Sequence, residues 1–254
     1  MEKEDNIGIS LVDTIGSSEA SSVLQELAEV AIDSLLKDGL LKDIPVVSSV
    51  IGLSKTAIAV KDFILIQKIL AFLKETSDIS KEERDKFIHD IDGNVNYKRK
   101  IGEHLIMLLD RLDDMSKPEM VAKIFKSYLK DNLTFNEFKR FSSIIDRIFV
   151  DDLAALLEAL SGDVPRMRHP FAEKIYHLGL SEIWFDDSDF QKVKGGLDNQ
   201  TLGFLDTFMN NSKEPIRFRL SENAYILAQI VLAKKIFGKD YVNQYCQARD
   251  NRID

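Results

Sequence analysis

The stretch Ile44–Leu73, IPVVSSVIGLSKTAIAVKDFILIQKILAFL, is the longest strongly apolar part of this sequence. Four charged residues interrupt it: Lys55, Lys61, Asp62 and Lys68. They recur too often for a membrane span, which needs about twenty residues almost free of charge. On a helical wheel they share one sector and leave a broad apolar face. The stretch therefore predicts one helix, or two helices broken near Gly52, buried against a helical bundle.

Charge is distributed unevenly around this stretch. Residues 1–43 carry ten Asp/Glu and three Lys/Arg, a net of −7, whereas residues 44–74 carry four Lys and one Asp, a net of +3. A cationic and strongly hydrophobic segment has to be covered by a core, a protein partner or a lipid surface. We expect burial in the core, and a helix lying in a membrane interface is the alternative. The candidate contacts to a partner or a membrane are Lys55, Lys61, Phe63, Ile66, Lys68 and, elsewhere in the chain, Trp184.

Length and composition bound the class of protein. With 254 residues, 44% of them hydrophobic and 30% charged, the chain fits a globular protein of one large or two small domains. Its one cysteine, Cys246, excludes an internal disulfide, and the first twenty residues lack the pattern of a secretory signal. We expect a cytoplasmic protein, with attachment to a membrane periphery as the alternative. The net charge of −8 argues against broad nucleic-acid binding.

The chain divides by pattern into three parts. Residues 1–20 are rich in Ser, Gly and acidic residues and predict a mobile acidic arm. Residues 21–160, including the apolar segment 44–73, predict an antiparallel helical bundle, because their connections are short. Residues 161–254 predict a small α+β module. The predicted fold is therefore mainly α, with a small α+β part at its C-terminal end.

Local capping signals place several helices in the bundle. Three S/T-x-x-E patterns start at Ser80, Ser116 and Thr134, and a related pattern joins Ser22 to Gln25. They predict caps rather than catalytic hydroxyl groups. The expected helices cover about 22–38, 81–92, 96–113, 117–130, 135–149 and 152–161. In the last third, residues 182–186 and 216–220 predict short strands, and Ser221 predicts the cap of a helix over 222–237, followed by another over 240–249.

The segment Lys126–Ile145, KSYLKDNLTFNEFKRFSSII, resembles the helix–loop–helix hairpins of TerB-like bacterial stress proteins. In those hairpins a polar loop of the type D-x-I-x-x-x-E-F joins two helices. The matching residues here are Asp131, Leu133, Glu137 and Phe138. The resemblance covers about twenty residues and implies a bacterial stress-related protein.

The C-terminal third resembles the winged-helix modules that end many bacterial proteins, including abortive-infection alpha proteins. The resemblance rests on Leu178-Gly179-Leu180, on the two predicted strands and on Phe218-x-Leu220-Ser221-Glu222 before a helix. It implies a role in phage defence. A DNA-reading module of this kind needs a cationic helix, for which Arg166, Arg168 and Lys174 are the candidate nucleic-acid contacts.

No motif for catalysis, metal binding or cofactor binding appears in the sequence. The four histidines form no zinc pattern, and phosphate loops and nucleophile elbows are missing. We therefore expect a non-enzymatic interaction protein without metal or cofactor, an accessory in stress response or phage defence with a masked amphipathic segment. Its expected partner is a protein or a second copy of the chain. The alternatives are a winged-helix DNA-binding regulator, a membrane-disrupting effector and an unrecognised hydrolase.

Overall fold

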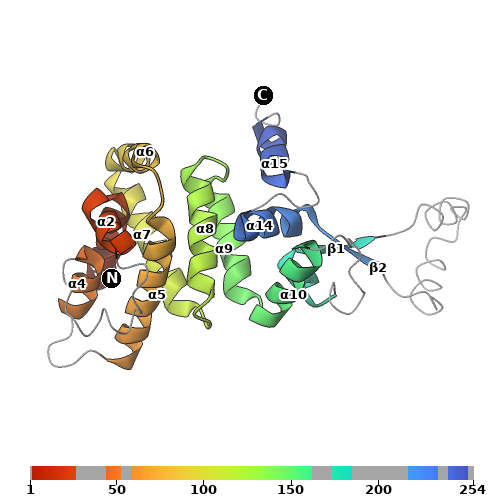
Figure 1. Cartoon of the computed structure of the whole chain (residues 1–254), viewed down its shortest axis with the longest axis horizontal. Helices are drawn as coiled ribbons and strands as arrows, with labels where there is room; N and C mark the ends of the chain where they lie inside the picture. The colour runs from red at the N-terminus through yellow and green to blue at the C-terminus, as the bar shows by residue number, and fades with distance from the viewer. Residues whose placement is uncertain are drawn as a thin grey trace, which may run out of the picture. The chain divides into compact units, whose positions relative to one another are not determined.

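The computed structural model describes residues 2–26, 44–52, 59–161, 173–184, 217–233 and 240–250. This part of the chain is mainly helical with a small antiparallel sheet of two strands, as the sequence predicts (Figure 1). The elements are α1 (Glu2–Gly16), α2 (Ser18–Glu26), α4 (Pro45–Gly52), α5 (Val60–Thr76), α6 (Lys81–Asp92), α7 (Val95–Arg111), α8 (Lys117–Leu129), α9 (Phe135–Arg147), α10 (Val150–Ser161), the 3-10 turn η3 (Tyr176–Leu178), β1 (Ser181–Trp184), β2 (Arg217–Leu220), α14 (Glu222–Leu232) and α15 (Tyr241–Asp250).

The chain forms two compact units, one from residues 1–147 and 242–254 and the other from residues 148–241. The second unit begins before residue 161, where we expected the C-terminal module to start, because α10 packs against α14. The C-terminal helix α15 has all but its first residue in the first unit. There the Tyr245 hydroxyl donates to Glu137 Oε1 at 2.7 Å, and Cys246 Sγ donates to the carbonyl of Asn132 at 3.1 Å.

The N-terminal residues differ from the expected mobile arm. They form α1 and α2, and Leu11 and Val12 of α1 are completely buried. The apolar residues Ile7, Leu11 and Ile15 recur every fourth position and make a helical stripe among the acidic side chains. The predicted Ser22 cap is also wrong, since α2 begins at Ser18 and the Ser17 hydroxyl accepts from the amide of Ala20 at 3.1 Å.

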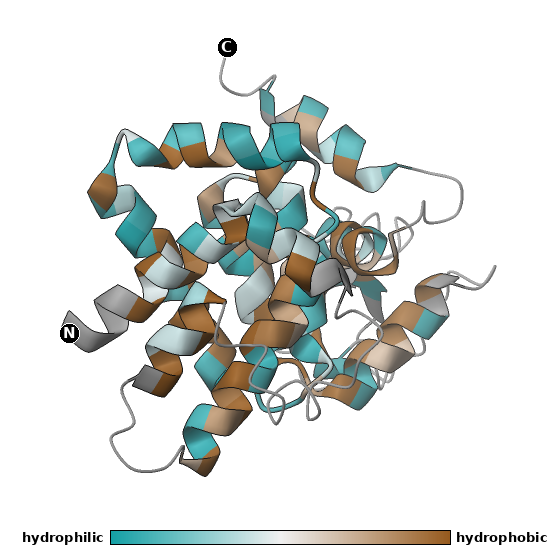
Figure 2. Cartoon of the chain, turned by 60° about the vertical axis from the view of Figure 1, so that its left-hand side comes forward, coloured by the Kyte–Doolittle hydropathy of each residue, from teal (hydrophilic) through white to brown (hydrophobic). Residues whose placement is uncertain are grey.

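The apolar stretch is buried in part, since α5 packs into the bundle as predicted while its first turn is exposed and α4 packs against the N-terminal helix α1. It forms α4 and α5, with the first helix ending at Gly52, while residues 53–58 lie outside the described part. Helix α4 packs against α1, and α5 packs against α7 and α8. The buried apolar side chains of the two helices are Val46, Val47, Val50, Ile66, Ile69, Leu70, Ala71, Phe72 and Leu73. In Figure 2 the helices carry apolar residues on some faces and polar residues on others, as amphipathic packing requires.

Two of the three capping boxes in the bundle are confirmed. Ser80 and Glu83 make both reciprocal bonds, and Thr134 and Glu137 do the same. Ser116 is not a cap, because its backbone is already helical and its hydroxyl donates to Asp114 Oδ1 at 2.6 Å. The Asp114 carboxylate also accepts from the Ser116 amide at 2.8 Å. The Asp114 carboxylate, two residues before Ser116, is therefore the hydrogen-bond acceptor at this helix start, where we expected the Ser116 hydroxyl to be the acceptor.

All three buried charged side chains of the described residues are basic: Lys68, Arg84 and Lys117. Each donates to a carbonyl in the last turn of another helix. Lys68 Nζ bonds to Asp110 O of α7 at 3.0 Å, Arg84 Nη1 to Ile15 O of α1 at 2.6 Å and Lys117 Nζ to Asp146 O of α9 at 3.1 Å. Carbonyls in this position have no partner within their own helix, and the helix dipole favours a cation there.

In the second unit, β1 and β2 pair antiparallel from Ser181↔Leu220 to Trp184↔Arg217. Ser221 precedes α14, but its hydroxyl donates to Gly179 O at 2.6 Å and does not cap the helix. Gly179 sits at a φ of 72°, a backbone conformation that favours glycine. Helix α14 ends at Leu232 with Ala233 in the left-handed region, earlier than the predicted end near residue 237.

The crossing of α1 and α7 generates our first prediction. A Cβ added to Gly8 would lie 2.8 Å from backbone atoms of Gly102 and Glu103, and one added to Gly102 would lie closer still to the Gly8 backbone. Since neither backbone can yield locally, we expect Gly8→Ala or Gly102→Ala to lower the free energy of unfolding by more than about 2 kcal/mol. Urea unfolding followed by circular dichroism measures the change.

Gly93→Ala is the matched control, because its added Cβ meets nothing within 4 Å and its φ is −67°. We expect this variant to change stability by less than about 1 kcal/mol, if anything upward. Equal effects at all three glycines would contradict a backbone-to-backbone crossing.

Candidate functional site

The candidate contact residues of the apolar stretch have different environments. Ile66 is completely buried, and Phe63 is half-buried. The Lys61 side chain is 78% exposed and pairs with the Asp110 carboxylate at 3.1 Å. Lys55 lies outside the described residues. Of this group, Lys61 is the side chain that α5 presents to solvent.

Lys68 is an internal contact of the bundle. Its ammonium group donates to the backbone carbonyl of the same Asp110 whose carboxylate pairs with Lys61. Burial lowers the pKa of Lys68 below its ordinary value, while the nearby carboxylates of Asp110 and Asp113 partly oppose that shift. The expectation that Lys68 and Ile66 contact a partner therefore does not fit the closed bundle, in which both side chains face inward.

The beginning of α5 is exposed. Val60 keeps 77% of its surface in solvent and Ile64 keeps 40%, and they lie one turn apart on the same face of the helix, with Lys61 beside them. We call Val60, Lys61 and Ile64 the α5-start surface. Because the charge of Lys61 is matched by Asp110, this surface offers apolar contact area more than net charge.

Helix α4 is held at its start by a residue of α1. Ile44 precedes α4 and has no side-chain acceptor, so the amide of Val46 donates to Thr14 Oγ1 at 3.3 Å. The Thr14 hydroxyl in turn donates to Ser10 O at 2.7 Å, and Ser10 Oγ lies 2.9 Å from Ser49 Oγ. Thr14 therefore caps α4 from another helix, a role that the sequence does not reveal because the two residues are 32 positions apart.

The other candidate contacts lie in the second unit. Trp184 ends β1 opposite Arg217, and its side chain lies outside the described part of the structure. Lys174 is exposed, and its ammonium group lies 3.7 Å from the Asp152 carboxylate. The proposed nucleic-acid contacts Arg166 and Arg168 lie outside the described residues. Of these three basic residues, Lys174 is therefore the one that the described part of the chain places.

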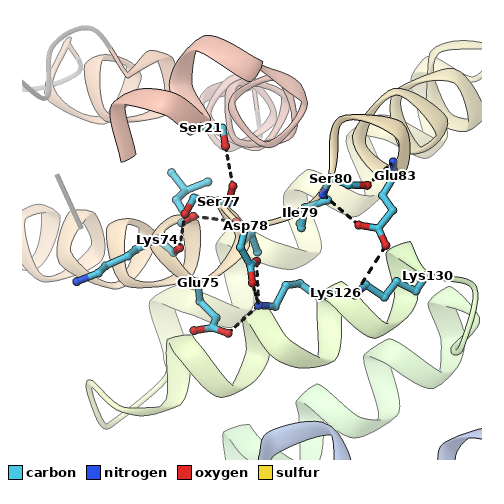
Figure 3. Close-up of polar contacts among 12 residues, drawn as sticks. Ser21, Lys74, Glu75, Ser77, Asp78, Ile79, Ser80, Glu83, Lys126 and Lys130 are labelled. Atoms are coloured by element: carbon cyan, nitrogen blue, oxygen red, sulfur yellow. Dashed lines mark hydrogen bonds and ion pairs between the residues drawn. The ribbon is translucent and has the colours of Figure 1, made fainter. Parts of the chain in front are cut away.

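A polar cluster joins the loop between α5 and α6 to α8 (Figure 3). Lys126 Nζ lies 2.8 Å from Glu75 Oε1 and 3.0 Å from Asp78 Oδ1, and Lys130 pairs with Glu83 at 3.8 Å. Burial acts to lower the pKa of Lys126. The hydrogen bonds to Glu75 and Asp78, together with their charges, have a larger opposite effect, so the pKa of Lys126 lies above its ordinary value. A lysine kept charged in this way is a poor nucleophile or base and serves to fasten helices.

His104 packs between aromatic rings of α9. Its ring centroid lies 5.9 Å from that of Phe135 and 5.7 Å from that of Phe138, both edge-on, and its Nε2 atom is buried without a hydrogen-bond partner. Burial, and then the charges of Lys139 and Arg111, lower the pKa of His104 to about 4. The ring is therefore a neutral packing group at ordinary pH.

No helix within the described ranges combines the length and hydrophobicity that a membrane crossing requires. Within the same ranges, no three His, Cys, Asp or Glu side chains gather in a way that suits a metal ion. Comparison of the chain with protein-family models, with curated proteins and with solved structures found no match. The proposal for function therefore rests on the α5-start surface and on the contact between α1 and α4.

His104 generates a prediction about pH. The ordinary histidine pKa is 6.5, so the unfolded chain takes up a proton below that pH while the folded chain resists it until about pH 4. Folding stability should therefore fall through this interval. His104→Phe keeps an aromatic ring and removes the titration. We expect the stability of the parent protein relative to this variant to fall by about 1–2 kcal/mol over that range, less than the full shift because the ring is partly solvated.

Urea unfolding of both proteins at several pH values between 6.5 and 4 checks this prediction. Other acid-titrating groups are common to both chains and cancel in the difference. A stability difference that stays constant over the interval would show that His104 titrates alike in the folded and unfolded chains.

Proposed function

We propose that this chain is a non-enzymatic interaction protein, an accessory in bacterial stress response or phage defence, whose segment α4–α5 engages a protein partner after α1 releases it. The observation that carries the proposal is the way α4 is held. This apolar helix of eight residues depends on α1 for the cap of its first turn. When α1 separates from α4, the first turn of α4 therefore loses its hydrogen-bond acceptor, Thr14, and its apolar face loses the helix that covers it.

The faces that α4 hides have the composition of a partner-binding surface. Val46, Val47 and Val50 are buried in the closed bundle, and α4 packs against α1 and α5. Separation of α1 from α4 exposes these three valines next to Ser48 and Ser49. An apolar helical face with a hydroxyl edge fits the groove of another helical protein.

The α5-start surface adds a contact that needs no rearrangement. Val60 and Ile64 are exposed in the closed state, and the exposed side chain of Lys61 lies beside them. A partner bound there lies on the same segment of chain as α4. Exposure of the first turn of α5 and burial of the α4 valines therefore support a two-stage engagement, with the exposed surface first.

The link to stress proteins rests on the resemblance of the α8–α9 hairpin. Asp131 adopts a φ of 58° in the turn, Leu133 and Phe138 are buried, and Glu137 completes a capping box. The four residues that carry the resemblance are thus the ones that shape this turn. This supports a TerB-like hairpin as a proposal about architecture, and the stress and defence roles follow from that resemblance alone.

A winged-helix DNA-binding regulator is the second candidate, favoured by the β1–β2 ribbon that runs into α14. Two features weigh against it. Glu222 is the single charged residue of α14, and Arg219 of the ribbon pairs with Glu182 at 2.6 Å. Reading a groove needs a cationic helix or ribbon. Salt-dependent binding of duplex DNA that is lost in Arg217→Glu is the expected result for this candidate, and fluorescence anisotropy measures it.

A disulfide between α1 and α4 tests the main proposal. Ser10 Oγ and Ser49 Oγ are 2.9 Å apart, so cysteines at both positions bring their sulfur atoms within bonding range. The variant Ser10→Cys/Ser49→Cys also carries Cys246→Ser, which keeps a donor toward Asn132 O. In the reduced variant, we expect α4 to open locally and α8 to open only with the core of the bundle. The free energy of opening measured from amide hydrogen exchange should therefore be lower for α4 than for α8. Oxidation should slow the α4 exchange at least about tenfold.

Native-state hydrogen exchange with mass spectrometry reads out both states. The matched control carries Ser10→Cys and Cys246→Ser without the second cysteine, so oxidant alone should change nothing. Exchange of α4 only through global unfolding in the reduced protein would overturn the proposal of a releasable segment. If the reduced form also floats with vesicles of phosphatidylcholine and phosphatidylglycerol and the oxidised form does not, the partner is a membrane surface and the alternative of a membrane effector is correct.

A further inference from the structure

Basic side chains lie on the solvent-accessible faces of α7 and α9, two helices that pack together. Lys100 and Arg111 come from α7, and Lys139, Arg140 and Arg147 come from α9. Four of them are exposed and Lys139 is half-buried. We call these five residues the α7–α9 strip. It stands out because the whole chain has a net charge of −8.

Helical spacing places the five cations on adjoining faces. On α7, Lys100 and Arg111 are eleven positions apart, close to three turns, and Met107 lies between them on the same side. On α9, residues 139, 140 and 147 fall within about 100° of one another. The rings of His104 and Phe135 meet edge-on, and Arg111 pairs with Asp146 at 3.1 Å, so Lys100, Arg111 and Lys139 border the seam between the two helices. Arg140 and Arg147 lie about 80–100° farther round α9, on its solvent-facing side.

Neighbouring carboxylates do not neutralise the strip. Glu103 pairs with Arg99 at 3.6 Å, and Asp110 pairs with Lys61. Asp146 is the acid that pairs with a member of the strip. Within the described part of the chain, Lys100, Lys139 and Arg140 form no ion pair with any carboxylate. Lys139 instead lies 5.2 Å from the centre of the Phe135 ring, a cation–π contact.

The strip also has an apolar centre. Met107 keeps 56% of its surface in solvent between Lys100 and Arg111. A flexible thioether among cations suits a partner that carries both apolar and acidic groups. Nucleic acid fits less well, because phosphates give nothing for Met107 to pack on and the acidic remainder of the chain repels a long polyanion.

We propose that the α7–α9 strip binds an acidic amphipathic helix of a partner protein, about three turns long. Its carboxylates face the cations from α7 and α9, and an apolar residue of its inner face packs on Met107. The length follows from the rise of about 1.5 Å per residue, which gives the eleven-residue separation on α7 a span of about 16 Å. This surface is separate from α4 and goes beyond the function proposed above.

A labelled amphipathic peptide with Glu and Leu at helical spacing is the probe, and a peptide with every Glu replaced by Gln is its control. Fluorescence anisotropy at low and moderate salt measures binding to the full chain. We expect the double variant Lys100→Glu/Arg140→Glu to weaken binding of the acidic peptide at least about tenfold, and Met107→Ser to weaken it several-fold. The Gln peptide should bind the parent protein weakly and with little salt dependence.

Matched variants separate the strip from net charge. Lys74→Glu/Lys81→Glu makes the same change in total charge at two exposed lysines outside the strip, and we expect it to bind the peptide within about twofold of the parent. Circular dichroism confirms that each variant is folded. The oxidised Ser10→Cys/Ser49→Cys protein should bind normally, so failure of the strip and failure of the α4 proposal are distinguishable.

Three results would overturn the inference. The first is binding of the acidic peptide that the strip variant and the control variant weaken equally. The second is the absence of any strip-dependent binding of that peptide. The third is strip-dependent binding of a single-stranded oligonucleotide more tightly than the acidic peptide, which would assign the surface to nucleic acid.

Discussion

The last carbonyl groups of a helix have no hydrogen-bond donor within that helix, and they need one when the helix ends inside a protein. In this bundle, buried basic side chains are the donors. Arg84 reaches from α6 to the end of α1, Lys68 from α5 to the end of α7 and Lys117 from α8 to the end of α9. Each bond ties two helices together at one end. A buried carbonyl without a hydrogen bond costs about 1–3 kcal/mol. These three hydrogen bonds therefore allow the C-terminal ends of α1, α7 and α9 to be buried.

Arg84 shows how such a cation is retained without a buried carboxylate. Its guanidinium also donates to Ser21 Oγ at 2.9 Å and to Ile79 O at 3.0 Å, and burial lowers its pKa below the ordinary value. The charge is distributed over neutral acceptors, while Asp85 and Asp78 lie near enough to favour the charged form. In a chain with a net charge of −8, the surrounding acidic surface lowers the cost of burying a positive charge.

Local patterns in the sequence predicted the helices that depend on local rules. The apolar period of the 44–73 stretch, its break at Gly52 and the boxes at Ser80 and Thr134 act within a few residues of themselves. The features that the sequence did not reveal join distant residues. The α1–α7 crossing needs glycine at positions 8 and 102 together, and neither glycine carries a signal alone.

The same reasoning explains why the candidate site was predicted only in part. Lys61 and Lys68 have the same residue type on the same helix, yet one ends at the Asp110 carboxylate and the other at the Asp110 carbonyl. Every residue has a backbone carbonyl group. The sequence therefore cannot indicate which carbonyl accepts a hydrogen bond from a buried lysine such as Lys68. Likewise the Thr14 hydroxyl caps α4 by accepting from the Val46 amide. Capping patterns in the sequence join residues a few positions apart and do not predict this contact between α1 and α4.

Helix α7 places the two proposed surfaces next to each other. Asp110 holds Lys61 of the α5-start surface, Met107 lies one turn earlier, and Lys100 and Arg111 belong to the strip. Charge acts over about 8–10 Å in physiological salt, whereas apolar contact acts only at touching distance. We therefore expect a partner drawn by the cations of the strip to approach the helix that also holds Lys61. Because Lys61 is already paired with Asp110, we expect the α5-start surface to favour a partner with apolar contact area and the strip to favour one with acidic charge.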